Sequence, residues 1–158
     1  MSTLKDFRFQ VEVGRNDGRT LDVVAPGKPV LTVATPPEFR RGVPNVWSPE
    51  EMLIAASASC YALTLGAIAE WLGVPIRDLG VTGAGHVTRR ADGRFGFVLI
   101  ELAVSLTTDH GFEHEARKAA RLAEARCLVD RALTVPVEVE LTIETADSAT
   151  YEAVGAVS

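Results

Sequence analysis

The sequence has two cysteines among its 158 residues and no cluster of basic side chains. Its formal net charge is −5, and its lysines and arginines are scattered. Nucleic acids and anionic membranes are held mainly by Lys and Arg, so we expect neither as a partner. The N-terminus also lacks the basic start and apolar run of a secretory signal, which favours the cytoplasm. In that reducing compartment, two cysteines are more often free, catalytic or redox-sensing than joined in a structural disulfide.

Several motifs of common enzyme classes are also missing. There is no G-x-S-x-G elbow, no P-loop and no G-x-G-x-x-G after a strand, so serine hydrolase, nucleotide-binding and dinucleotide-binding functions lack support. His110 and His114 stand four residues apart beside Asp109 and Glu113. Without an HExxH motif or an obvious third ligand, we expect no metal there.

Length and composition are those of an ordinary globular protein. The chain is 47% hydrophobic and 23% charged, and its length suits one domain over residues 1–158. We expect a core over about 7–145 and a C-terminal tail at 146–158. The uncharged stretch 52–69, rich in alanine, predicts a buried core helix rather than a membrane span.

Hydrophobic periodicity predicts an α+β domain in the order β-β-β-α-β-β-α-β. Alternating residues and turn signals predict strands, the last with one wet face, at 7–13, 21–24, 30–34, 79–89, 95–108 and 135–144. Helical spacing covers 48–72 and 112–126, with a short helical turn at 128–133. In the strand 95–108, one face is predicted to hold Val98, Ile100, Leu102, Val104 and Leu106.

The first helix has a strong start signal. Ser48 is the predicted N-cap, Pro49 takes the first helical position, and Glu51 completes a capping box. Gly73 is the predicted end of the helix. This helix carries Cys60, and the second helix ends near Cys127.

Cys60 is the candidate nucleophile. The thiolate is the attacking species, and a free cysteine with a pKa of about 8.5 is mostly protonated at neutral pH. An arginine nearby would favour the thiolate, and Glu50 is a carboxylate that could fix the arginine in place. The candidate arginines precede the first helix: Arg15, Arg19, Arg40 and Arg41.

Helix geometry limits how this site is assembled. Ten positions separate Glu50 from Cys60, which is about 15 Å along a straight α-helix. Either the helix breaks, or Glu50 and its arginine serve Cys60 of a second subunit. The small residues at 55–59 would let two such helices approach closely, so we favour a two-fold dimer.

Structural roles are open alternatives. A buried cysteine is often only a small hydrophobic residue, and this applies to Cys60 and Cys127 taken separately. Glu50 and Glu51 also suit the first turn of a helix, where carboxylates stabilise the helix dipole.

Two motifs resemble a known family. The stretch Ser-Pro-Glu-Glu-Met-Leu-Ile-Ala-Ala-Ser-Ala-Ser-Cys at 48–60 resembles the N/S-P-E-x-L-x-x-A-A-x-x-x-C motif of the OsmC/Ohr family, the osmotically inducible and organic hydroperoxide resistance proteins. Cys-Leu-Val-Asp-Arg-Ala-Leu at 127–133 is similar to the family's C-P-V-S-x-A-L. The likeness covers about residues 7–145 and is closest to the OsmC-like branch.

The resemblance implies an OsmC-like fold, with antiparallel sheets wrapped around long central helices in an intertwined homodimer. It also implies a thiol peroxidase acting on organic hydroperoxides in oxidative stress defence, without metal or flavin. Cys60 would form a sulfenic acid and then a disulfide with Cys127, which a lipoyl-type dithiol or a small thiol reduces.

The resemblance also assigns the activating pair. Glu50 falls on the family's arginine-positioning glutamate. One branch places the arginine in a G-G-R-D-G turn, which matches Arg15, and the other places it ten residues before the glutamate, which matches Arg40. Leu128 replaces the usual proline and Asp130 the usual serine, so a new negative charge lies near Cys127.

A second hypothesis keeps the fold without the chemistry. The protein would then be a non-catalytic module that binds a small apolar ligand or senses redox state, and Cys60 would have an ordinary pKa.

Overall fold

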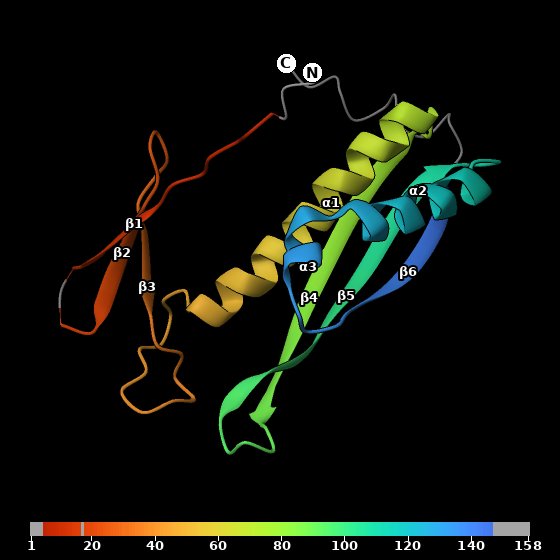
Figure 1. Cartoon of the computed structure of the whole chain (residues 1–158). Coiled ribbons are helices and arrows are strands. Elements are labelled where there is room, and N and C mark those ends of the chain that lie inside the picture. The colour runs from red at the N-terminus through yellow and green to blue at the C-terminus, as the bar shows by residue number, and fades with distance from the viewer. Residues whose placement is uncertain (1–4, 17, 147–158) are drawn as a thin grey trace. The chain divides into compact units, whose positions relative to one another are not determined.

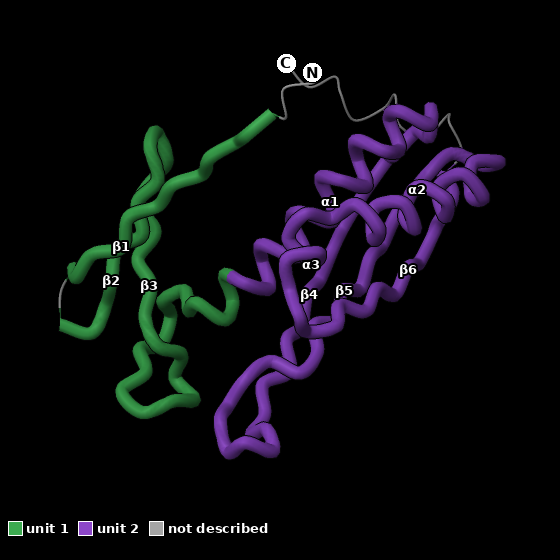
Figure 2. The backbone as a smooth tube through the Cα atoms, viewed as in Figure 1, with its two compact units in different colours: residues 1–52 green, residues 53–158 purple. Residues whose placement is uncertain are grey.

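The computed structural model describes residues 5–16 and 18–146 (Figure 1). The chain divides into two compact units, Met1–Met52 and Leu53–Ser158 (Figure 2). Except for Ala146, the predicted tail lies outside the described residues.

The first unit contains a small antiparallel sheet. Its strands are β1 (Glu12–Arg15), β2 (Thr20–Val24) and β3 (Leu31–Ala34), in the order β1-β2-β3. The turn between β2 and β3 is closed by the Lys28 N–H, which donates to the Ala25 carbonyl at 3.1 Å.

The first predicted strand is shorter than expected. Residues 7–11 lie outside the sheet, and the side chains of Phe7 and Phe9 are 72% and 93% exposed. The reason is the length of the neighbouring strand. β2 ends at Val24, opposite Glu12, so the earlier residues have no partner strand.

A closed loop follows β3. The Val43 N–H donates to the Thr35 carbonyl at 3.0 Å, and the Ala34 N–H donates to the Trp47 carbonyl at 2.9 Å. Gly42 lies against its own loop so closely that a Cβ there would be 2.1 Å from the Pro36 carbonyl oxygen. The loop therefore requires glycine at this position.

The helix α1 (Pro49–Leu72) confirms the predicted boundaries. The backbone N–H of Ser48 donates to Glu51 Oε2 at 2.8 Å, and the Glu51 N–H donates back to Ser48 Oγ at 3.2 Å. This is the predicted capping box. Gly73, with φ of +70°, ends the helix.

The second unit is built on a three-stranded sheet in the order β4-β5-β6 (Figure 1). The long strands β4 (Ile76–Arg89) and β5 (Phe95–Asp109) form the predicted hairpin. Two helices, α2 (Glu113–Arg126) and α3 (Leu128–Ala132), then lead to β6 (Val137–Ala146).

The second sheet corrects one expectation about strand direction. β6 pairs with β5 in parallel, from Ile100 opposite Val137 to Asp109 opposite Ala146. The sheet is therefore mixed rather than purely antiparallel. The connection through α2 and α3 is long enough to return the chain to the start of β5, as parallel pairing requires.

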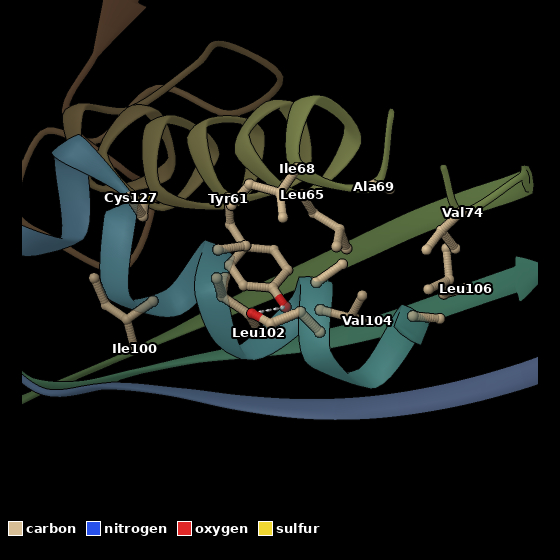
Figure 3. Close-up of a cluster of buried hydrophobic side chains, with 14 residues drawn as sticks. Tyr61, Leu65, Ile68, Ala69, Val74, Ile100, Leu102, Val104, Leu106 and Cys127 are labelled. Carbon is tan, nitrogen blue, oxygen red and sulfur yellow. Dashed lines mark hydrogen bonds between the residues drawn. The ribbon is translucent and has the colours of Figure 1, made fainter. Parts of the chain in front are cut away.

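The core of the second unit lies between this sheet and the helices (Figure 3). From β5 it takes Ile100, Leu102, Val104 and Leu106, each at most 2% exposed. Val98, expected on the same face, is 39% exposed. The register shifts between His86 and Val87 on the opposite strand, and this irregularity interrupts the alternation at Val98.

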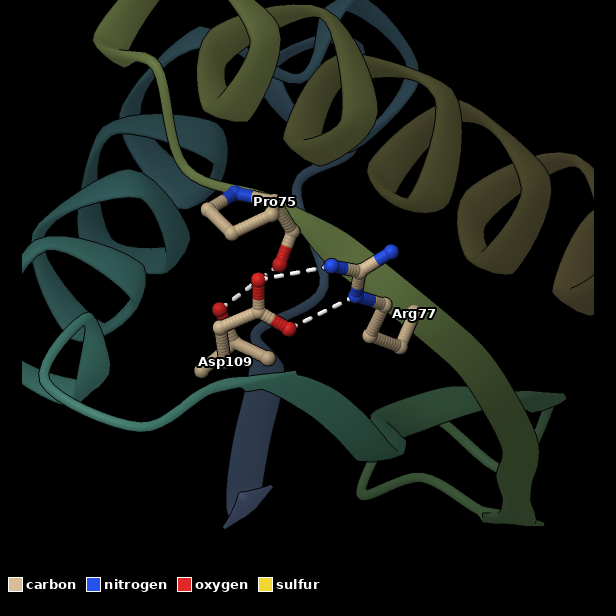
Figure 4. Close-up of polar contacts among 4 residues, drawn as sticks. Pro75, Arg77 and Asp109 are labelled. Atoms are coloured by element: carbon tan, nitrogen blue, oxygen red, sulfur yellow. Dashed lines mark hydrogen bonds and ion pairs between the residues drawn. The ribbon is translucent and has the colours of Figure 1, made fainter. Parts of the chain in front are cut away.

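Polar contacts fasten the start of β4 to the end of β5 (Figure 4). Arg77 donates to both carboxylate oxygens of Asp109, from Nε at 2.6 Å and from Nη2 at 2.7 Å. Beside this pair, the Thr108 hydroxyl donates to the Pro75 carbonyl at 2.7 Å. The guanidinium holds the pKa of Asp109 below its usual value, mainly through these hydrogen bonds.

Only one stripe of α1 is buried. It consists of Ser57, Tyr61, Leu65, Ile68 and Ala69. By length and composition α1 could cross a bilayer. In this chain only 28% of its most apolar 18-residue stretch is buried. Leu63 and Trp71 are 75% and 71% exposed. An apolar face of α1 is therefore uncovered in the single chain.

Candidate functional site

The second unit brings the two cysteines together. Cys60 lies in the middle of α1 and is partly buried, and Cys127 joins α2 to α3 and is fully buried. Cys60 packs against the hydrophobic cluster that contains Cys127. The two thiols are free and lie within hydrogen-bonding reach of each other. A pair of adjacent thiols is the arrangement that a reversible disulfide requires.

The surroundings of Cys60 favour its thiolate. Burial raises the pKa of this thiol, but four donors outweigh that effect, so its pKa lies below the ordinary value. The donors are the backbone N–H groups of Val129 and Leu128, the Cys127 thiol and the Thr64 hydroxyl. A lowered pKa makes a cysteine more reactive at neutral pH.

The backbone donors come from the first turn of α3. The first N–H groups of a helix have no partner within the helix, and Leu128 and Val129 begin this one. They therefore have hydrogen atoms free to meet the Cys60 sulfur.

The surroundings of Cys127 have the opposite effect. Burial, together with the nearby Asp130 carboxylate and Cys60, raises the pKa of Cys127 to about 12. Asp130 is in turn held by Ser57, a fully buried residue whose hydroxyl donates to Asp130 Oδ1 at 2.5 Å. The two thiols thus differ in pKa. Cys60 ionises more readily than an ordinary cysteine, and Cys127 stays protonated.

Tyr61 lies against the buried side of this site. Its side chain is fully buried, and its hydroxyl donates to the Ala120 carbonyl at 3.4 Å (Figure 3). Burial, with the charges of Glu124, Asp130 and Cys127, raises the pKa of Tyr61 well above its usual value. The phenol is therefore a neutral packing element, joining α1 to α2.

Glu50 lies in the first turn of α1, as predicted. Its Oε2 atom is buried and has no hydrogen-bond partner among the residues that the structure describes. α1 continues without a break from Glu50 past Cys60, so the two residues of one chain are separated by about 15 Å of helix. The structure thus excludes a broken helix as the way to join them.

The candidate arginines belong to the first unit. Arg15 is the last residue of β1, Arg19 directly precedes β2, and Arg40 and Arg41 lie in the closed loop after β3. All four are exposed. Arg41 has φ of 69°, in the left-handed region that non-glycine residues seldom occupy.

The sequence already placed the Asp130 charge near Cys127, but sequence reasoning missed Thr64, Ser57 and the position of Asp130 in the first turn of its helix. Thr64 follows Cys60 by four residues, a spacing that puts both on one helix face. Asp130 follows Cys127 by three, which is the spacing between an N-cap residue and the third residue of a helix. These two signals were present in the sequence. The link from Ser57 to Asp130 had none, because the two residues meet only through tertiary packing.

Comparison with known proteins gives the family by sequence. The family model for OsmC-like proteins matches residues 42–142. The protein YmaD of Bacillus subtilis (strain 168) is 30% identical over 131 residues, which cover 80% of this chain and 84% of that protein.

Solved structures share the fold at low sequence identity. An OsmC-like protein from Vibrio cholerae has a TM-score of 0.79 at 16% identity, covering 87% of this chain and all of that chain. An organic hydroperoxide resistance protein from Elizabethkingia anophelis has a TM-score of 0.69 at 21% identity, covering 92% of this chain and 100% of that one. These likenesses establish the fold.

Proposed function

Because this chain belongs to the OsmC-like protein family, we propose that it is a cysteine-based peroxidase that reduces organic hydroperoxides in oxidative stress defence. Organic hydroperoxide resistance proteins share its fold. The observation that carries the proposal is the pair of adjacent thiols, in which Cys60 has a lowered pKa and Cys127 a raised one. A ligand-binding module would have no need of a lowered pKa at Cys60.

In the first step the Cys60 thiolate attacks the outer oxygen of the hydroperoxide. A sulfur–oxygen bond forms, the oxygen–oxygen bond breaks, and the leaving alkoxide takes a proton to become an alcohol. The donors around Cys60 hold the sulfur in its reactive charged state before the peroxide arrives. The product is a Cys60 sulfenic acid.

In the second step the Cys127 sulfur attacks the Cys60 sulfenic acid. A disulfide forms, and the hydroxyl group leaves with a proton as water. A lipoyl-type dithiol or a small thiol then exchanges with the disulfide and returns both cysteines to the reduced state. We place this cycle in the cytoplasm, where such reductants are kept reduced.

The active protein in this proposal is a homodimer. The exposed apolar face of α1, with Leu63 and Trp71, gives a reason to pair two chains. The continuous helix prevents Glu50 from reaching Cys60 of its own chain. The Oε2 atom of Glu50 is buried and lacks a hydrogen-bond partner among the described residues. We propose that Glu50 positions Arg15 or Arg40 beside Cys60 of the second chain.

The direct test is consumption of cumene hydroperoxide with dihydrolipoamide as the reductant. We expect the native protein to turn over and Cys60→Ser to be inactive. Cys127→Ser should react once and stop at the sulfenic acid. Native rates no higher than those of Cys60→Ser would rule out the peroxidase.

A mixing experiment tests the shared site. Cys60→Ser and Glu50→Gln proteins, each impaired alone, are unfolded together and refolded. In a mixed dimer with shared sites, one site regains both native residues, so activity should return to about a quarter of the native value. If each site is built within one chain, mixing restores nothing.

A further inference from the structure

Asp130 stands between a buried hydroxyl and a buried thiol. Ser57, with no exposed surface, donates to Asp130 Oδ1 at 2.5 Å. The Cys127 thiol lies within hydrogen-bonding reach of the same carboxylate. Ser57 belongs to α1 and Asp130 to α3, so their hydrogen bond joins the two helices. The carboxylate is therefore fixed in place beside the second cysteine.

The Cys127 thiol ionises with difficulty, and the Asp130 carboxylate is placed to accept its proton. Burial first, and then its charged neighbours, raise the pKa of Cys127 to about 12. At pH 7 the Cys127 thiol therefore stays protonated. The thiolate is the nucleophile in disulfide formation, so waiting for spontaneous ionisation would make the second step slow.

We propose that Asp130 is a catalytic residue that accepts the Cys127 proton while the Cys127 sulfur attacks oxidised Cys60, and that Ser57 positions its carboxylate. This inference rests on the proposed function for its setting. A carboxylate within hydrogen-bonding reach of the proton it removes meets the geometric requirement for a general base.

The sulfur–hydrogen bond of Cys127 breaks and its proton passes to Asp130. The electron pair left on that sulfur forms the new bond to Cys60, and the Cys60 sulfur–oxygen bond breaks. Asp130 then gives the proton to the departing hydroxide, which leaves as water. No oxidant beyond the hydroperoxide is needed.

A purely electrostatic role for Asp130 predicts the opposite behaviour. A negative charge beside a thiol opposes its ionisation, so a carboxylate that only repelled the thiolate would slow disulfide formation. Removing the charge would then accelerate the second step. Removing a general base slows it, typically by about 10²–10⁴-fold. The sign of the effect separates the two roles.

The experiment uses the aromatic disulfide dithiobis(nitrobenzoic acid), which requires no peroxidase activity. The Cys60 thiolate displaces one thionitrobenzoate and keeps the other as a mixed disulfide. Cys127 then attacks the Cys60 sulfur and releases the second thionitrobenzoate. Stopped-flow absorbance follows the two releases separately, and Cys127→Ser should give only the first.

We expect Asp130→Asn to leave the first release within about threefold of native and to slow the second at least about tenfold at pH 7, because the loss of the base outweighs the easier ionisation. Glu140→Gln, the same change of charge at an exposed position on β6, should change neither phase. Ser57→Ala should slow the second phase by a smaller factor. It provides a second variant if Asp130→Asn folds poorly.

The pH profile distinguishes catalysis from a structural defect. With the base present, the second phase should change little between about pH 6 and 9. Without it, the rate should rise nearly tenfold per pH unit, because only the thiolate can attack. The groups that act on this thiol or its buried neighbours are Cys60 and Tyr61 on α1, Glu124 on α2 and Asp130 on α3.

An unchanged or faster second phase in Asp130→Asn overturns the inference, whether or not the protein consumes hydroperoxides. If instead the native protein consumes no hydroperoxide but Asp130→Asn still slows the second phase with the steeper pH profile, the proposed function fails and the role of Asp130 stands.

Discussion

Replacing Leu128 with proline removes one donor from the Cys60 thiolate without removing a needed side-chain contact. The Leu128 N–H is one of the groups that lower the pKa of Cys60, and proline has no N–H. The Leu128 side chain is 76% exposed, so its loss costs little packing. The similar family motif has proline at this place.

The backbone accepts this substitution. Leu128 is the first residue of α3, where proline is favoured. Cys127 before it has φ of −59° and ψ of 115°, which is outside the α region that proline disfavours for the preceding residue. A change in reactivity would therefore report the lost donor.

A hydrogen bond to a charged group contributes about 1.5–3 kcal/mol, and one pKa unit corresponds to about 1.4 kcal/mol. Cys60 is only partly buried and keeps three other donors, so we expect the lost bond to count at the low end of this range and the pKa of Cys60 to rise. The rate of alkylation at neutral pH should fall by up to about tenfold.

The assay is alkylation by iodoacetamide across pH, with the Cys60 peptide quantified by mass spectrometry. Leu128→Ala is the matched control, because it loses the same side chain and keeps the N–H. We expect its pH profile to match the native one. A Leu128→Pro profile at or below the native pH midpoint would refute the contribution of this N–H to the thiolate.

Three further predictions concern stability. Gly42→Ala should lower the free energy of unfolding in urea by about 1–3 kcal/mol, because the new Cβ meets loop backbone, whereas Gly14→Ala, at an open position, should change it by less than about 0.5 kcal/mol. Arg77→Met should lower the melting temperature at pH 7. Because the folded pKa of Asp109 is depressed, the stability from this pair is present above the unfolded pKa and disappears as pH falls through the folded one, so a constant difference down to pH 2 would contradict it. Tyr61→Phe should cost about 0.5–1.5 kcal/mol for its bond to a backbone carbonyl of α2, and an unchanged urea midpoint would show that bond to be unimportant.

The elements that the sequence predicts well are those with local signals. The capping box of Ser48 and Glu51 and the terminating Gly73 define α1, because caps depend on residues within one turn. Alternation along β5 predicts its buried face from Ile100 to Leu106.

Local sequence signals do not predict features that depend on residues far apart in the chain. Periodicity does not reveal strand direction, so the parallel pairing of β6 was not predicted. Residues 7–11 alternate like a strand but have no strand to pair with. The bulge that exposes Val98 depends on the register of β4.

The candidate site shows the same division. Motif spacing selected Cys60, Cys127 and Glu50, and the structure brings the two cysteines together. The two backbone donors that lower the Cys60 pKa come from the start of α3, and the buried link between Ser57 and Asp130 joins α1 to α3. Such contacts depend on how helices pack, which local sequence patterns do not encode.

The most direct test of the central claim is peptide mapping after one equivalent of cumene hydroperoxide is added to the fully reduced protein. A Cys127→Ser sample with a sulfenic acid trap serves as the parallel control. The account predicts a Cys60–Cys127 disulfide in the native protein and a trapped sulfenic acid on Cys60 in the control. Two unmodified thiols in the native protein, with the hydroperoxide intact, would contradict it.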